Sequence, residues 1–182
     1  MKLGDDVYID KDCLIKRPEH IEIGSHVAID KGVIVSTQLS VGDYVHIAPY
    51  VVMIGGKNSK VILDDFSFVA AGTKIVAGSE DYTGAGLVGP TIPEEYRDIN
   101  YSTVKFEKYS GCGVNCSIMP GVVFGEGAIL GANSLATKDL EPWTIYVGSP
   151  AKPVRLREKE TILDYSNKLG YYYDIWWYKY KY

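Results

Sequence analysis

Residues 106–136 read FEKYSGCGVNCSIMPGVVFGEGAILGANSLA, and every sixth residue of this stretch is apolar or small. These positions are Phe106, Cys112, Ile118, Phe124, Leu130 and Ala136. A small or β-branched residue follows four places after most of them, at Ser110, Cys116, Val122, Ala128 and Ser134. Neither the 3.6-residue period of a helix nor the two-residue period of a strand gives this spacing, whereas a hexapeptide period is typical of a parallel β-helix.

The same period extends back to the N-terminus. Its apolar positions there fall into groups of three: Leu3, Ile9, Ile15; Ile23, Ile29, Val35; Val41, Ile47, Met53; Leu63, Val69, Ile75. Three hexapeptides close one triangular coil, and each coil buries its apolar residues against the coils above and below. We therefore predict an all-β protein, a parallel β-helix of about six coils.

Three interruptions break the period, and all of them follow a third hexapeptide. Two extra residues follow Ile15, four follow Met53 and twenty-five follow Ile75. Because the interruptions share one phase, we expect them to leave the prism at one corner. The longest, over residues 79–103, is predicted to be an inserted loop that contacts the acceptor, since long loops in compact domains are usually functional.

Composition narrows the class of function. The net charge of −4 and the lack of a Lys/Arg cluster argue against nucleic-acid binding. No apolar run is long enough to span a membrane, and the N-terminus lacks a secretory signal, so we expect a cytoplasmic protein. Cys13, Cys112 and Cys116 lack metal-ligand spacing and occupy small apolar repeat positions, so we expect core thiols and no metal site.

The C-terminal segment, residues 156–182, lies outside the repeat domain of residues 1–155. Residues 157–169 are predicted to form a short charged helix, and eight of the last twelve residues are aromatic. We expect this aromatic tail to pack against the prism or a neighbouring subunit. The alternative is a peripheral contact with a membrane or a partner protein, because Trp and Tyr suit such interfaces.

Residues 124–155, FGEGAILGANSLATKDLEPWTIYVGSPAKPVR, carry the most specific pattern in the chain. They closely resemble the closing coils of the hexapeptide-repeat acyltransferases, in the branch of bacterial sugar O- and N-acetyltransferases. The resemblance implies a left-handed β-helix, a homotrimer with active sites between subunits, and acetyl-CoA as the acyl donor. It also implies a sugar or nucleotide-sugar acceptor, in surface-polysaccharide (lipopolysaccharide) biosynthesis.

The resemblance also places the coenzyme A site. Gly131, Ala132 and Ser134 match the small residues that let the pantetheine arm approach the coil. Thr137, Lys138, Lys152 and Arg155 match the contacts to its nucleotide end, where phosphates need cations or hydrogen-bond donors.

One expected residue is missing. In the sugar acetyltransferases a His in the long loop serves as the base, and Glu80 stands at that point here. Three solutions are open. Glu80 or Asp81 is the base, with a pKa raised in a dry cleft; or His46, from another corner, meets Glu80 of a neighbouring subunit; or the acceptor is an amine, which needs less base assistance.

Three further residues are predicted to bind the acceptor. Tyr82 and Arg97 lie in the inserted loop, and Arg97 is expected to meet a phosphate if the acceptor is nucleotide-linked. Tyr50 stands where related enzymes have an acceptor-binding Asn. The structural alternative for His46 is a stacked column of Tyr8, His26, His46 and Phe68 in successive coils.

Two other functions are compatible with the same prism. A trimeric scaffold without catalytic activity would explain the missing His, although the coenzyme A segment argues against it. A carbonic-anhydrase-like metal enzyme would need three His ligands in one site. His20, His26 and His46 are spaced six and twenty residues apart, which does not favour a tetrahedral zinc site.

Overall fold

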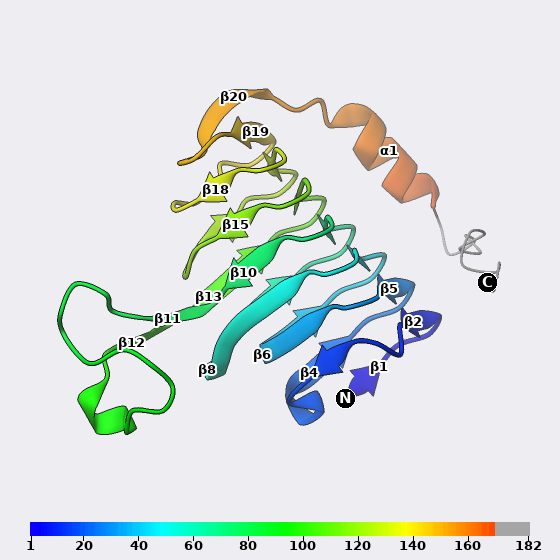
Figure 1. Ribbon diagram of the computed structural model, residues 1–182. Coiled ribbons are helices and arrows are strands. Elements are labelled where there is room, and N and C mark those ends of the chain that lie inside the picture. Colours follow the sequence, from blue (N-terminus) through cyan, green and yellow to red (C-terminus); the bar gives the residue numbers. More distant parts are fainter. Residues whose placement is uncertain (170–182) are drawn as a thin grey trace.

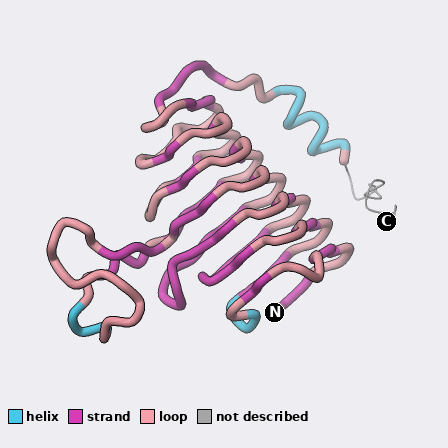
Figure 2. Tube along the Cα trace, viewed as in Figure 1, coloured by secondary structure: helices cyan, strands magenta, loops and turns pink. Residues whose placement is uncertain are grey.

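A computed structural model describes residues 1–169 of the chain as a triangular prism of stacked coils (Figures 1 and 2). The first face of the prism is an eight-stranded sheet. Seven of its strands follow one another up the stack, and these are β2 (Val7–Ile9), β5 (Val27–Ile29), β7 (His46–Ile47), β9 (Phe68–Val69), β14 (Gly111–Cys112), β17 (Ile129–Leu130) and β19 (Thr144–Val147). The prism thus has about seven layers, one more than the repeat alone predicts.

The other two faces form a continuous ten-stranded sheet. The second face contains β3 (Leu14–Ile15), β10 (Lys74–Val76), β15 (Ser117–Ile118) and β18 (Leu135–Ala136). The third contains β1 (Lys2–Leu3), β4 (Ile21–Ile23), β13 (Thr103–Phe106) and β16 (Val123–Phe124). Two long strands run through both faces, β6 (Ile34–Val41) and β8 (Val52–Leu63). A short 3₁₀ turn, Pro18–His20, joins β3 to β4.

From the second coil upward the hexapeptide positions form the core, as predicted, whereas Leu3 in the first coil is 53% exposed. Strand pairing aligns Ile9 with Ile29, Ile29 with Ile47, and Ile47 with Val69, so each column of the repeat is one vertical stack. Phe106 and Phe124 are fully buried and stack with their ring centroids 4.0 Å apart. Cys112 and Cys116 are buried free thiols, and the side-chain interaction with Cys116, followed by burial, raises the pKa of Cys112. Cys13 is a free, half-buried thiol packed against the same core.

The three corners of the prism differ. The insertion corner, between the second and third faces, contains residues 16–20, 36–38, 54–60, 77–102, 119–122 and 137–139. The four extra residues after Met53, residues 55–58, lie at this corner within β8 and form no separate loop there. The pairing of β8 with β6 shifts register at Thr37. The first face joins the two remaining corners, so it lies opposite the insertion corner.

The aromatic corner, between the third and first faces, carries a ladder of stacked rings. His26, Tyr44, Phe66 and Tyr109 follow one another with centroids 4.6, 5.0 and 5.3 Å apart, and Trp143 continues the ladder at 6.0 Å. All five residues have a left-handed backbone, with φ between 52° and 63°. At Gly127 the ladder has no side chain, because a Cβ there would lie 2.4 Å from the Trp143 ring.

The C-terminal end of the prism is covered by the last strand, from which the chain continues into the helix. At the C-terminal end β20 (Lys152–Leu156) turns back and pairs antiparallel with β19, and α1 (Glu160–Lys168) then returns along the aromatic corner, within the predicted helix (Figure 1). Arg157 donates to the carbonyls of Tyr109 and Gly127 at 2.7 and 3.0 Å and lies over the Trp143 ring. The predicted aromatic tail lies outside the described residues. No helix within residues 1–169 has the length and apolar character to cross a membrane.

Candidate functional site

The inserted loop and a surface cavity both lie at the insertion corner. The loop leaves the prism through β11 (Gly78–Glu80), makes a 3₁₀ turn at Glu94–Tyr96, and returns through β12 (Ile99–Tyr101), which pairs antiparallel with β11 (Figure 1). Higher up the same corner, a cavity of about 260 Å³ is lined by Ala136, Thr137, Lys138, Asp139, Leu140, Tyr146, Pro150, Ala151, Lys152 and Pro153. The corner predicted to carry the insertions therefore carries both features.

The cavity brings together three of the residues predicted to bind coenzyme A. Thr137, Lys138 and Lys152 line it, and Ala132 is exposed one corner away. Arg155 lies further along β20, exposed and outside the lining. Two ammonium groups beside a hydroxyl at an open cavity suit a polyanionic ligand.

Gly131 and Ser134 support the site from within the prism. The Ser134 hydroxyl is buried, accepts the Gly148 N–H at 2.9 Å and so fixes the turn that leads to β20. A Cβ on Gly131 would lie 2.7 Å from Cγ1 of Val147, so the space above this glycine is filled by protein. These contacts give both residues a structural role, and the ligand contacts predicted for Gly131 and Ser134 stay predictions.

Glu80 is held inside the loop. Its carboxylate accepts Nε–H of Arg97 at 2.6 Å, and both oxygens lie 3.0 Å from the Gly89 N–H. The Glu80 and Arg97 side chains are only 12% and 16% exposed. The Gly89 N–H lowers the pKa of Glu80 most, and Arg97 lowers it further, against the opposing effect of burial. The raised pKa predicted for Glu80 is wrong, because its hydrogen bonds favour the charged form.

Asp81 has a similar local role. Its carboxylate accepts the hydrogen bonds of Thr83, which lower the pKa of Asp81 rather than raise it as predicted. Beside it Tyr82 is 75% exposed. The loop thus has a hydrogen-bonded interior around Glu80 and a solvent-facing aromatic side chain, and Arg97 reaches that interior through its bond to Glu80.

His46 lies on β7, on the face opposite the loop. Its Nε2 is 2.8 Å from Oδ2 of Asp30, a residue of the same chain in the coil below. The predicted column is partly wrong, because strand pairing aligns Tyr8 with Ala28, Ala28 with His46, and His46 with Phe68. His26 instead belongs to the aromatic ladder. The two-residue offset between turn and strand positions explains the error.

The third corner, between the first and second faces, holds Tyr50. Its backbone is left-handed, with φ +60°, and its exposed ring lies over Gly32 in the coil below, where a Cβ would be 2.5 Å from Cδ1 of Tyr50. The contact shows why residue 32 is a glycine. Tyr50 and Asp30 therefore belong to the same side of the prism, away from the loop of their own chain.

Asp30 is the residue that sequence reasoning missed. The signal was present, because residues 29–30 repeat the apolar-Asp pair of residues 9–10 and precede His46 by one coil. Pairing Asp30 with His46 from the sequence requires the exact register between two coils that have no insertion between them. Within residues 1–169, no three His, Cys, Asp or Glu side chains are arranged to hold a metal ion.

Comparison with known proteins identifies relatives along most of the chain. It is 32% identical over 163 residues to dTDP-4-amino-4,6-dideoxy-D-glucose acyltransferase of Escherichia coli, covering 88% of this chain and 84% of the relative. It is 30% identical over 164 residues to the putative lipopolysaccharide biosynthesis O-acetyl transferase WbbJ of E. coli K12, covering 86% and 79%. No protein-family model matches the chain.

Solved structures agree with these relatives. AntD, an N-acyltransferase from Bacillus cereus solved with dTDP and 3-hydroxybutyryl-CoA, superposes with a TM-score of 0.87 at 34% identity, covering 92% of this chain and 88% of AntD. A variant of AntD has been solved with dTDP-4-amino-4,6-dideoxyglucose and coenzyme A. The similarity confirms the predicted left-handed β-helix.

Proposed function

Since the chain belongs to the hexapeptide-repeat sugar acyltransferases and is an acyl-CoA-dependent enzyme of that family, we propose that it acylates the amino group of a nucleotide-linked amino sugar. One observation carries the choice of an amine. Glu80, at the point where the O-acetyltransferases have a His base, is fixed by Arg97 and Gly89 with a lowered pKa. Such a carboxylate is a weak base, and an amine needs less assistance than a hydroxyl.

The reaction follows from the chemistry of the two substrates. The neutral amine attacks the thioester carbonyl, and the new C–N bond gives a tetrahedral intermediate with a negatively charged oxygen. Collapse of this intermediate breaks the C–S bond, and the nitrogen loses a proton to a base. The coenzyme A thiolate leaves and is protonated, so the products are an amide and free coenzyme A.

The insertion corner supplies the donor site in this proposal. Thr137, Lys138 and Lys152 line the open cavity, which suits the phosphates of coenzyme A. The loop below it, with the exposed ring of Tyr82, faces the acceptor. Aromatic rings stack on nucleobases, so a loop of this kind suits the base of a nucleotide-linked sugar.

We further propose a homotrimer whose active sites are shared between subunits. His46 and Tyr50 lie on or beside the first face, whereas the loop and cavity lie at the opposite corner of the same chain. These groups can meet only across two copies. A closed ring of three copies places the first-face side of one chain against the insertion corner of the next.

Mixed trimers test this arrangement. We expect His46→Gln and Lys138→Ala/Lys152→Ala each to be nearly inactive at low acyl-CoA concentration. A shared site needs an intact His46 from one chain and an intact cavity from another. Random co-assembly of the two variants should therefore recover about one quarter of wild-type activity. Mixtures that stay as inactive as their components would contradict the shared site.

A transfer assay with mass detection tests the substrate. The acceptors are dTDP-4-amino-4,6-dideoxyglucose and the matched sugar nucleotide with a hydroxyl at C4, and the donors are acetyl-CoA and 3-hydroxybutyryl-CoA. We expect the amino sugar to be acylated at least a hundredfold faster, because a neutral amine is a stronger nucleophile than a hydroxyl and the loop carboxylate is a weak base. Faster acylation of the hydroxyl sugar would overturn the proposal.

The second candidate is O-acetylation of a sugar during surface-polysaccharide biosynthesis. The observation that favours it is the 30% identity to the putative lipopolysaccharide O-acetyl transferase, over 86% of the chain. The hydroxyl acceptor in the assay above distinguishes this function from N-acylation. A chain that binds acetyl-CoA but transfers to neither acceptor would instead support the scaffold alternative.

A further inference from the structure

Two histidines of the chain each face an aspartate, His26 at the aromatic corner and His46 on the first face. Nδ1 of His26 lies 3.1 Å from Oδ2 of Asp6, and Nε2 of His46 lies 2.8 Å from Oδ2 of Asp30. Both pairs join neighbouring coils, across 20 and 16 residues of sequence. Their surroundings differ, and this difference separates a structural pair from a functional one.

The His26–Asp6 pair belongs to the aromatic ladder. The His26 ring stacks on Tyr44 with an interplanar angle of 20°, and its backbone holds the left-handed turn of that corner. Stacking covers one face of the imidazole, so its position is explained by packing alone.

The His46 ring projects from the flat first face. The residue directly below it on this face is Ala28, which leaves room for the imidazole to reach down to Asp30. The His46 side chain is 38% exposed and that of Asp30 only 18%, so the carboxylate is shielded while the ring reaches solvent. A shielded carboxylate hydrogen-bonded to one ring nitrogen is the arrangement that orients the imidazole in catalytic His–carboxylate pairs.

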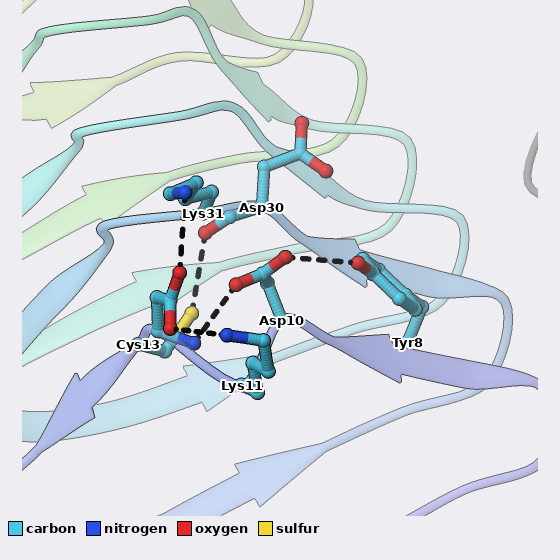
Figure 3. Close-up of polar contacts among 7 residues, drawn as sticks. Tyr8, Asp10, Lys11, Cys13, Asp30 and Lys31 are labelled. Carbon is cyan, nitrogen blue, oxygen red and sulfur yellow. Dashed lines mark hydrogen bonds and ion pairs between the residues drawn. The ribbon is translucent and has the colours of Figure 1, made fainter. Parts of the chain in front are cut away.

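The position of Asp30 is fixed from both sides. Its N–H donates to the carbonyl of Ile47 at 2.9 Å, and its own carbonyl accepts the thiol of Cys13 at 3.2 Å. Figure 3 shows that the Asp30 carboxylate points away from the neighbouring cluster of Asp10, Lys11 and Lys31. In that cluster the Lys31 ammonium pairs with Asp12 at 3.2 Å. Asp30 thus presents its carboxylate to His46 from a rigid backbone.

The pair also fixes the protonation of the ring. An ionised carboxylate only accepts hydrogen bonds, so Nε2 of His46 is the nitrogen that carries the proton in the neutral imidazole. Nδ1 then holds the lone pair and is the basic nitrogen.

We propose that Asp30 is a positioning residue for catalysis. It holds His46 with Nδ1 as the proton acceptor for the attacking amine, whose proton moves to Nδ1 as the C–N bond forms. The inference rests on the proposed acyl transfer, and it assigns the base that the loop does not provide. In the proposed trimer, His46 on the first face of one copy lies at the loop and cavity of the neighbouring copy.

The first test is spectroscopic and needs no substrate. Nitrogen-15 NMR of the wild-type histidines distinguishes the two neutral tautomers, and His46→Gln identifies the signals of residue 46. We expect the Nε2–H tautomer for His46, with a measurable loss of that preference in Asp30→Ala. A wild-type His46 with its proton on Nδ1 would overturn the inference.

The second test is kinetic, with the other pair as control. Asp30→Asn should lower kcat about a hundredfold and leave KM for acyl-CoA within twofold, because the residue contacts no substrate. Asp6→Asn, the matched change in the structural pair, should keep kcat within threefold. In a His46→Gln background, Asp30→Asn should cause no further loss, because both residues act through one ring.

The outcomes separate this inference from the proposed function. A wild-type chain that does not acylate the amino sugar contradicts the function, whatever the tautomer of His46. Normal turnover that survives Asp30→Asn contradicts the inference alone. Equal losses from Asp30→Asn with and without His46 also contradict it, because Asp30 would then act independently of the histidine.

Discussion

The aromatic corner and the insertion corner are built from the same coils and differ in how their side chains are used. At the aromatic corner each ring stacks on the ring of the next coil, and α1 covers part of the ladder through the 3.0 Å contact of Ser166 with Tyr109. At the insertion corner the strands lengthen, shift register and admit a loop of more than twenty residues. Its lysines at 138 and 152 face an open cavity.

The difference shows how a repetitive fold can contain a specific site. Side chains that stack on one another contribute to stability, and their contact surfaces are covered and cannot bind a ligand. Where the repeat is interrupted, charged and aromatic groups remain exposed for a ligand. We therefore expect changes at one corner to affect stability and changes at the other to affect binding.

The largest expected effect is at the aromatic corner. Phe66→Ala removes the ring between Tyr44 and Tyr109 and should lower the free energy of unfolding by about 3 kcal/mol, the low end for a large-to-small aromatic change. Guanidinium titration at one fixed protein concentration measures it. Phe66→Tyr keeps the ring and should stay close to wild type. The coenzyme A dissociation constant should not change, and a tenfold change would break the division between corners.

The insertion corner should give the opposite result. Lys138→Ala/Lys152→Ala should weaken coenzyme A binding about a hundredfold, since each charge-assisted contact contributes roughly tenfold. Titration calorimetry provides the measurement, and the melting temperature should stay within a few degrees of wild type. Lys168→Ala, an exposed lysine of α1, is the control. Equal affinities for the double variant and the control would place coenzyme A elsewhere.

Glu80→Gln tests whether Glu80 is a catalytic base or a structural brace, meaning a residue that holds Arg97 in place. As a brace that fixes Arg97, Glu80 should affect acceptor binding, so the variant raises KM for the acceptor about tenfold and changes kcat little. As a base, Glu80 would affect kcat and leave KM unchanged. Steady-state kinetics at saturating acyl-CoA separates the two outcomes.

Acid titration tests the same brace without a substrate. Because the pKa of Glu80 is lowered in the folded chain, its contribution to the loop is fully present above the ordinary range of a glutamate. The contribution is lost only as the pH falls through the lowered value. The NMR shift of the Gly89 N–H should therefore titrate with a midpoint below about 4.3, the usual pKa of Glu. The Glu80→Gln variant should show no such transition.

The smallest effect concerns Gly131. A Cβ at this position meets a side-chain methyl of Val147, so Gly131→Ala should destabilise the chain by about 1 kcal/mol. Val147→Ala should recover most of this loss, because it removes the crowded methyl. Unchanged coenzyme A affinity in both variants would fit a packing role. A loss of affinity that Val147→Ala does not recover would place Gly131 in the ligand site.

The sequence predicts the repeating part of this molecule well, because burial acts on every sixth residue in the same way. The columns that contain Ile29 and Val35 follow directly from spacing, as does the corner at which the insertions leave. Lys138 and Lys152 could be grouped only through resemblance to a family, since fourteen residues separate them. Their common cavity depends on the turn that brings β20 back against β19.

Polar pairs were the part that spacing could not predict. Glu80 meets Arg97 only because β11 and β12 form a hairpin, and no periodicity marks that partner. His46 meets Asp30 because two coils stack without an insertion, whereas His26 was placed in the wrong column by an offset of two residues. Each such pair depends on register between segments, and register becomes known only when the chain is folded.

The stacked rings of the aromatic corner have a consequence for how such proteins diversify. Their centroids are 4.6 to 6.0 Å apart, and an added residue at this corner would separate two rings and break the stack. Length variation in descendants of this chain should therefore accumulate at the insertion corner, where the strands already bend and lengthen. New insertions can then be accepted at the insertion corner while the stacking of the coils is unchanged. An engineer who grafts new loops onto the prism would begin at that same corner.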